Sequence, residues 1–121
     1  PDIMKECYRI LKPGGIMSNA IDYRDHWSFF DNEISVYNYL QYSEKEFDKI
    51  NPSIMYQNRM RHKDYMKIIS EAGFKILEEI KNEPDEIEKE QLGKISLNEY
   101  YKNKYNFDEL GIKSSMLVLS K

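Results

Sequence analysis

Asp22, Asp25 and His26 bring two carboxyl groups and an imidazole together in one short segment. An imidazole titrates near neutral pH, so His26 is a candidate general base that could take a proton from a hydroxyl group. Asp25 is the candidate residue that orients the His26 ring, and Asp22 is a candidate substrate contact. The same residues could instead cap a helix and hydrogen-bond a loop. Their spacing matches no standard metal-ligand motif, so we assign no metal site.

A second polar cluster contains Asn58, Arg59 and Arg61. The guanidinium group offers a planar fork of donors that fits carboxylate and phosphate groups. These three residues are therefore candidate substrate-binding residues, suited to an acidic or sugar-nucleotide acceptor. The alternative is that both arginines pair with surface acids such as Asp64 or Glu71.

The elements that must position these residues begin with a helix that ends at a tight turn. Apolar residues recur at helical spacing over residues 3–11, and Pro13 followed by two glycines predicts the turn. Residues 16–22 then form a short strand, so Asp22 lies at the carboxyl end of that strand.

The middle of the chain predicts further helices. Asp31 or Asn32 is expected to begin one helix, and Ser43 with Glu46 forms a capping box that begins another. Asp64 is the expected N-cap of a helix that Gly73 ends.

The remainder predicts a strand at 74–80, a solvated charged connection at 78–90, a helix that begins at the Ser96 capping box, a link at 106–111 and a last strand at 115–120.

Aromatic residues are more abundant than a small core requires. The chain has ten tyrosines, and some of them are expected to line a pocket or an interface, because tyrosine combines an apolar ring with a polar tip. We expect Trp27, Phe29 and Phe30 to be buried rather than to form a lid. Tyr100, Tyr101 and Tyr105 are expected to pack on the sheet.

Three motifs resemble landmarks of the class I S-adenosylmethionine-dependent methyltransferases. Residues 8–15, Y-R-I-L-K-P-G-G, resemble the segment that joins the fourth helix of that family to its fifth strand. Residues 71–74, E-A-G-F, resemble the segment before the sixth strand, and 115–119 resemble the antiparallel seventh strand between those two. The resemblance implies an α/β fold: a partial Rossmann-like methyltransferase sheet with the last three strands, the final one antiparallel, and a helical insert after the first.

Residues 1–121 would then be the C-terminal part of one methyltransferase domain. In chain order its parts are a helix, turn and strand at 1–22, a helical substrate-side insert at 23–63, a helix and strand at 64–80, a connection and helix at 81–112, and a final strand at 113–121. The insert is similar to one in bacterial methyltransferases of small-molecule and polysaccharide pathways.

The cofactor-binding motif of that family is missing from this chain. The family holds S-adenosyl-L-methionine with a glycine-rich loop after its first strand and an acid that ends its second strand. The five glycines here form no G-x-G pattern. The resemblance therefore implies the acceptor-side portion of an enzyme that methylates a small molecule, inactive as an isolated chain. It places Asp22, Asp25 and His26 beside the acceptor.

The composition argues against some other functions. The net charge is −3, with 18 basic and 21 acidic residues, so the sequence shows no excess of basic residues of the kind that binds nucleic acid. We expect no membrane insertion and a cytoplasmic location, because Cys7 is the only cysteine and no signal peptide or long apolar run is present.

The alternative to a methyltransferase is a non-catalytic α/β protein-interaction module. A hydrolase lacks support, since no G-x-S-x-G motif occurs. An incomplete sheet also predicts self-pairing through its exposed edge.

Overall fold

Helix α1 (Asp2–Ile10) leads through a tight turn into strand β1 (Ile16–Asp22) in the computed structural model, which describes residues 2–121. In the turn, the amide of Gly15 donates to the carbonyl of Lys12 at 2.8 Å, and Gly14 has a φ of 73°. A type II turn requires a positive φ at this position, which glycine adopts without steric cost. The predicted helix, turn and strand are confirmed.

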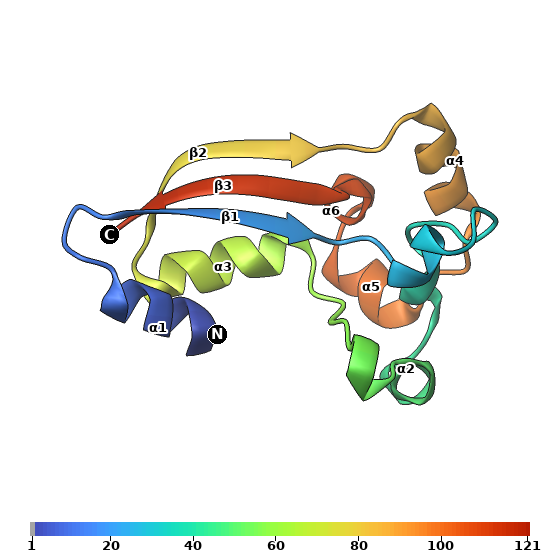
Figure 1. The fold of residues 1–121 in the computed structure, drawn as a ribbon. Helices are drawn as coiled ribbons and strands as arrows, with labels where there is room; N and C mark the ends of the chain where they lie inside the picture. The colour runs from blue at the N-terminus through green and yellow to red at the C-terminus, as the bar shows by residue number, and fades with distance from the viewer. Residues whose placement is uncertain (1) are drawn as a thin grey trace.

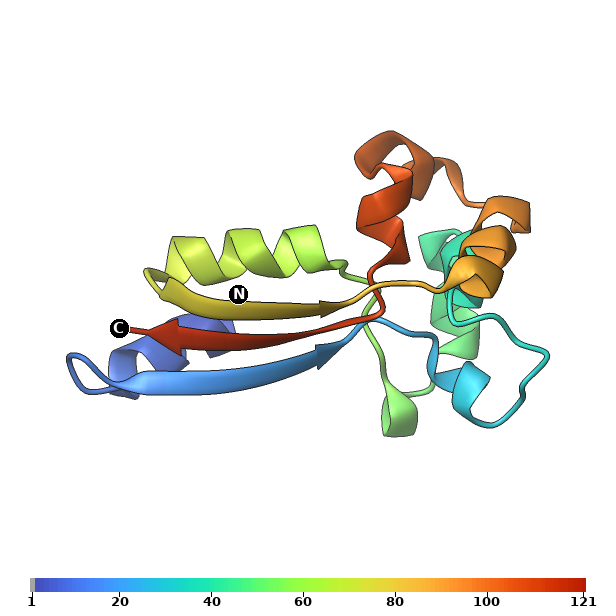
Figure 2. The ribbon, with the colours of Figure 1, turned by 90° about the horizontal axis from the view of Figure 1, so that it is seen from above.

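Three strands form one open sheet in the order β1-β3-β2. Strand β3 (Ser114–Ser120) pairs antiparallel with both β1 and β2 (Lys75–Asn82), so β1 and β2 run parallel to each other on either side of it (Figure 2). The predicted α/β class and the central, antiparallel position of the last strand are confirmed.

Helices α1 and α3 (His62–Ala72) cover one face of the sheet (Figure 1). The core between them and the sheet is built around Ile69, Phe74, Leu117 and Leu119. Helix α3 ends at Gly73, whose φ of 99° provides the predicted left-handed C-terminal residue.

Helix α3 begins three residues earlier than the sequence predicts, so Asp64 is not its N-cap. Arg61 is the residue at the N-cap position, and its amide donates to Oδ2 of Asp64 at 2.9 Å. Asp64 therefore satisfies an unpaired amide from inside the first turn, where a negative charge also favours the helix dipole.

The opposite face of the sheet is apolar and exposed. Ile16, Met116 and Ile80 are 62%, 51% and 59% exposed, and Ala20, Met116 and Ile80 lie side by side across the three strands. No helix among residues 2–121 covers this face, and no described strand pairs with the outer edge of β1 (Figures 1 and 2).

The remaining helices gather beyond the carboxyl ends of β1 and β2 (Figure 1). We call residues 23–61 and 83–113 the helical lobe. Its elements are the 3-10 helices His26–Phe29, Asn38–Gln41 and Ser53–Met55, and the helices α2 (Glu44–Ile50), α4 (Glu86–Lys94), α5 (Glu99–Lys104) and α6 (Phe107–Gly111). The lobe has its own core, formed by Tyr37, Tyr39, Leu40, Phe47, Leu92, Tyr101, Tyr105 and Leu110.

Several predicted elements of the lobe are wrong. The helix expected after Asp31 or Asn32 is reduced to a 3-10 turn, whereas the Ser43–Glu46 capping box begins α2 as predicted. The connection expected at 78–90 contains the end of β2 and the start of α4, and the link at 106–111 is α6. Asn98, rather than Ser96, caps α5.

Trp27, Phe29 and Phe30 are 41%, 52% and 70% exposed, so the prediction that they are buried is wrong. Rings exposed in succession remain available for contact with another molecule. Across residues 2–121, the helices are all too short or too polar to cross a membrane.

Candidate functional site

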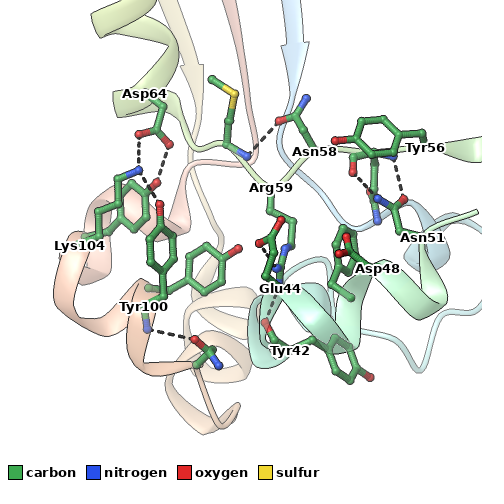
Figure 3. Close-up of a pocket in the computed structure, with 16 residues that line it drawn as sticks. Tyr42, Glu44, Asp48, Asn51, Tyr56, Asn58, Arg59, Asp64, Tyr100 and Lys104 are labelled. Carbon is green, nitrogen blue, oxygen red and sulfur yellow. Dashed lines mark hydrogen bonds and ion pairs between the residues drawn. The ribbon is translucent and has the colours of Figure 1, made fainter. Parts of the chain in front are cut away.

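A pocket of about 540 Å³ opens in the helical lobe between α2, residues 56–60 and α5 (Figure 3). Its walls are rich in aromatic residues, with charged and amide groups among them. The lining residues are Tyr42, Glu44, Phe47, Asp48, Asn51, Tyr56, Gln57, Asn58, Arg59, Met60, Asp64, Asn98, Tyr100, Tyr101, Lys104 and Tyr105. Five of the ten tyrosines line this pocket, as expected for some of them.

Arg59 provides a buried cation in this pocket, with a side chain only 5% exposed. Its Nη1 donates to the backbone carbonyls of Tyr39 and Tyr42 at 3.1 and 2.5 Å, and its Nη2 donates to Oε2 of Glu44 at 2.9 Å. The Cζ atom lies 4.2 Å from the ring centre of Phe47, a cation–π distance. These contacts hold the guanidinium plane in one orientation.

Tyr101 lies on the other side of Arg59, with its ring centre 5.4 Å from Cζ. Burial raises the pKa of Tyr101 to about 12, so its hydroxyl stays protonated at neutral pH and can donate a hydrogen bond. Tyr101 and Tyr105 stack with centroids 6.2 Å apart and belong to the core of the lobe. The prediction that these tyrosines pack on the sheet is therefore wrong.

Asp64, Lys104 and Tyr105 form a network at one side of the pocket (Figure 3). Oδ1 of Asp64 lies 2.9 Å from Nζ of Lys104, and the Tyr105 hydroxyl donates to Oδ2 at 2.5 Å. Burial raises the pKa of Asp64, but the hydrogen bonds from Tyr105 and Lys104 outweigh it and lower that pKa overall. Burial lowers the pKa of Lys104, and its hydrogen bonds reverse that effect, so both groups are charged at neutral pH.

The structure separates the two predicted arginines. Asn58 and Arg59 line the pocket, whereas Arg61 is 0% exposed and lies outside it. The four terminal N–H groups of Arg61 donate to the Tyr39 hydroxyl and to the carbonyls of Tyr23, Leu110 and Ile112. Arg61 has no terminal donor left for a ligand, so its predicted role in substrate binding is not supported. Neither arginine side chain pairs with Asp64 or Glu71.

Asp25 is buried and serves as an N-cap. Its Oδ1 accepts from the Trp27 amide at 2.9 Å, and its Oδ2 accepts from Nδ2 of Asn38 at 3.1 Å. No hydrogen bond joins the Asp25 carboxylate to the ring of His26 within the described chain. The geometry therefore favours the capping role that the sequence left open, and the orienting role remains a prediction.

Asp22 and His26 also lie outside the pocket. Asp22 pairs with Arg24 at 2.7 Å. Burial raises the pKa of Asp22, but hydrogen bonds from Arg24 outweigh it and lower the pKa overall. The backbone amide of His26 donates to Oε1 of Gln57, and its ring lies 6.2 Å from that of Phe29. In residues 2–121, no three His, Cys, Asp or Glu side chains gather as a potential metal site.

Lys104 and Asp64 line the pocket although the sequence did not indicate either of them. Both were visible only as ordinary charges on predicted helices, one in α5 and one in the first turn of α3. Nothing in their local spacing brings them together, because the contact joins positions 40 residues apart in the chain, at 64 and 104. The excess of tyrosines was the one available signal.

Comparison of the chain with models of protein families, with curated proteins and with solved structures finds no match in any of the three. The assignment of a function therefore depends on topology, on the pocket and on the residues that line it.

Proposed function

We propose that this chain is the C-terminal, acceptor-side portion of an S-adenosylmethionine-dependent methyltransferase that acts on a small molecule. The observation that carries the proposal is the strand order β1-β3-β2, with the last strand antiparallel between two parallel ones. The methyltransferase motifs in the sequence imply this arrangement for the fifth, seventh and sixth strands. Helix α3 joins β1 to β2 in the position expected of the crossover helix.

The place of the pocket supports the same proposal. In open α/β sheets, ligands bind beyond the carboxyl ends of the parallel strands. The helical lobe lies beyond those ends of β1 and β2, and the pocket is built from lobe residues and Asp64 (Figures 1 and 3). A methyl acceptor held there would lie on the side of the sheet where the donor is expected.

The uncovered face and edge of the sheet are a third line of support. Ile16, Met116 and Ile80 expose apolar area that a complete domain would bury, and the outer edge of β1 offers unpaired backbone groups to a further strand. Both features fit a sheet that continues beyond β1 with additional strands and covering helices.

The glycine turn of this chain differs from the cofactor-binding loop of the proposed family. The Gly14–Gly15 turn precedes β1, and a Cβ atom at Gly15 would lie 2.8 Å from Leu11, so this glycine serves local packing rather than a ligand cradle. The methyl donor would be held by residues outside this chain. The lobe would bind and align the acceptor. His26, which lies outside the pocket, is the candidate base for an acceptor hydroxyl that projects from the pocket toward it.

Calorimetry with S-adenosylmethionine tests this proposal on two proteins: this chain and the longer reading frame that contains it. We expect no binding to the isolated chain, and both binding and methyl transfer by the longer protein. Sequence upstream of Pro1 should encode a glycine-rich loop after a strand. Tight binding by the isolated chain, or a longer protein without affinity for the cofactor, would overturn the proposal.

The role of His26 is tested in that longer protein by His26→Asn. If His26 is the base, the rate of methyl transfer falls about 100-fold or more, while affinity for the cofactor is unchanged. His62→Asn is the control, since the His62 ring contacts Glu79 on the sheet and lies near Tyr23, and His62 does not line the pocket. Equal rates in wild type and His26→Asn would remove His26 from the mechanism.

A further inference from the structure

The buried cation of the pocket has an exposed counterion. The Arg59 side chain is 5% exposed, whereas the side chain of its carboxylate partner, Glu44, is 84% exposed. A buried guanidinium group is costly unless its charge is compensated, and an exposed carboxylate compensates weakly because water screens it. The carbonyl groups of Tyr39 and Tyr42 satisfy Nη1 but carry no net charge.

Arg59 also retains donors for a ligand. Both N–H groups of Nη1 are used by carbonyls, and one N–H of Nη2 is used by Glu44. The Nε–H and the second N–H of Nη2 make no hydrogen bond to residues 2–121. Nε and Nη2 flank one edge of the guanidinium plane, so a carboxylate that displaced Glu44 could accept from both nitrogens with two parallel hydrogen bonds.

Among the charged side chains that line the pocket, Arg59 is the one best placed to bind an anion. Lys104 and Asp64 pair with each other, so neither offers a free charge. Asp48 is a lining carboxylate that would repel an anion, but it is exposed, so water screens its charge. The walls around Arg59 are rings, including Phe47 and Tyr101, that favour a flat apolar body.

We propose that the pocket binds a small aryl carboxylate, whose carboxylate replaces Glu44 on Arg59 while its ring packs against the tyrosines. Glu44 is then an exchangeable counterion that occupies the anion site when no ligand is bound. As a statement about the methyl acceptor, this inference rests on the proposed function. As a statement about binding it does not, because binding requires no methyl donor.

Binding of 4-hydroxybenzoate and of its neutral analogue 4-hydroxybenzamide to the 121-residue chain tests the proposal by calorimetry or NMR titration. We expect the acid to bind about tenfold more tightly than the amide. Glu44→Gln removes the competing carboxylate from an exposed position, so it should strengthen binding of the acid about two- to fivefold and leave the amide unchanged. Arg59→Gln should abolish the preference for the acid.

Equal affinity for acid and amide, absence of binding by both, or an unchanged affinity in Glu44→Gln would each overturn the inference. Glu44→Gln keeps the test decisive even if Arg59→Gln does not fold, because Glu44 is exposed and the Ser43–Glu46 capping box remains intact. None of the pocket residues belongs to β1, so self-pairing at that edge leaves the assay valid. A longer protein that binds the acid but has no affinity for S-adenosylmethionine would contradict the proposed function and leave this inference intact.

Discussion

Tyr105 donates its phenolic hydrogen to Oδ2 of Asp64 at 2.5 Å, which joins the end of α5 to the first turn of α3 beside the pocket. The other carboxylate oxygen of Asp64 pairs with Lys104, and Oδ2 also accepts from the Arg61 amide. One carboxylate therefore connects the helical lobe to the helix that covers the sheet.

Asp64→Asn should lower the free energy of unfolding at pH 7 by about 1–2 kcal/mol, because it removes charge-assisted hydrogen bonds. The pKa of Asp64 is lowered in the folded protein, so its contribution is present above the unfolded value of about 3.9 and is lost as pH falls through the folded pKa. Urea unfolding of wild type and Asp64→Asn at several pH values measures the difference in their free energies of unfolding.

The difference between wild type and Asp64→Asn should therefore narrow as the pH falls from 5 toward 2. Asp48→Asn, at an exposed position of α2, is the control and should stay close to wild type throughout. A difference for Asp64→Asn that is independent of pH would contradict the assigned role of its charge.

Gly73→Ala and Gly93→Ala should change stability in opposite directions. Gly73 has a φ of 99°, and a Cβ atom there would lie 3.1 Å from the ring of Tyr8, so alanine should cost about 1–2 kcal/mol. Gly93 lies within α4 with no atom within 4 Å of the added Cβ, so alanine should gain about 0.5–1 kcal/mol. Thermal unfolding of both variants measures the two effects, and a shared sign would refute this account.

Local signals in the sequence predicted the parts of the fold that local chemistry determines. The proline-glycine turn, the Ser43–Glu46 capping box and the left-handed Gly73 each act within a few residues, and each is present. Helices α4 and α6 also begin with capping boxes, at Asp85 and Asn106. They were missed because their charged composition hides the short apolar face that each one buries.

Long-range contacts determine the rest. The helix expected around Tyr37 does not form, because the hydroxyls of Tyr37 and Tyr39 bind the carbonyls of Gly111 and Tyr23 in the lobe. Arg61 had the composition of a binding residue, and its burial depends on carbonyls near position 110 that no local pattern reveals. The sequence therefore could not indicate that Arg59 lines the pocket and Arg61 does not.

Arg61→Met should lower the free energy of unfolding by about 3 kcal/mol or more. A loss of this size would show that Arg61 stabilises the fold rather than binds a ligand. The substitution keeps an apolar stem but leaves the buried carbonyls of Leu110 and Ile112 without their Arg61 donor, and it leaves the Tyr23 carbonyl with the Tyr39 hydroxyl alone. Urea unfolding measures the loss. Arg9→Met is the control, because Arg9 is 70% exposed and pairs only with Glu6 on the surface. A variant as stable as wild type would show that Arg61 is free to serve another purpose.

The two edge strands of the sheet, β1 and β2, differ in how well they are protected against pairing with a strand of another molecule. This difference predicts which edge the isolated chain uses when it associates. Strand β2 carries four charged residues and a bulge near Leu77, both of which hinder pairing with another strand. Strand β1 has no charged residue before Asp22, and its central residues Ser18 and Ala20 are uncharged and exposed. We therefore expect the chain to self-associate through β1.

Ala20→Lys places a charge on the unprotected edge and should shift the chain toward monomer in sedimentation velocity, without a large loss of helical signal in circular dichroism. Glu78→Lys changes the charge of β2 by two units rather than one and should nevertheless leave association as it is in wild type. If wild type sediments as a monomer and melts in one sharp transition, the edge of β1 is stable without a partner. The sheet would then need no further strand, and the support it lends to a larger methyltransferase domain would be lost.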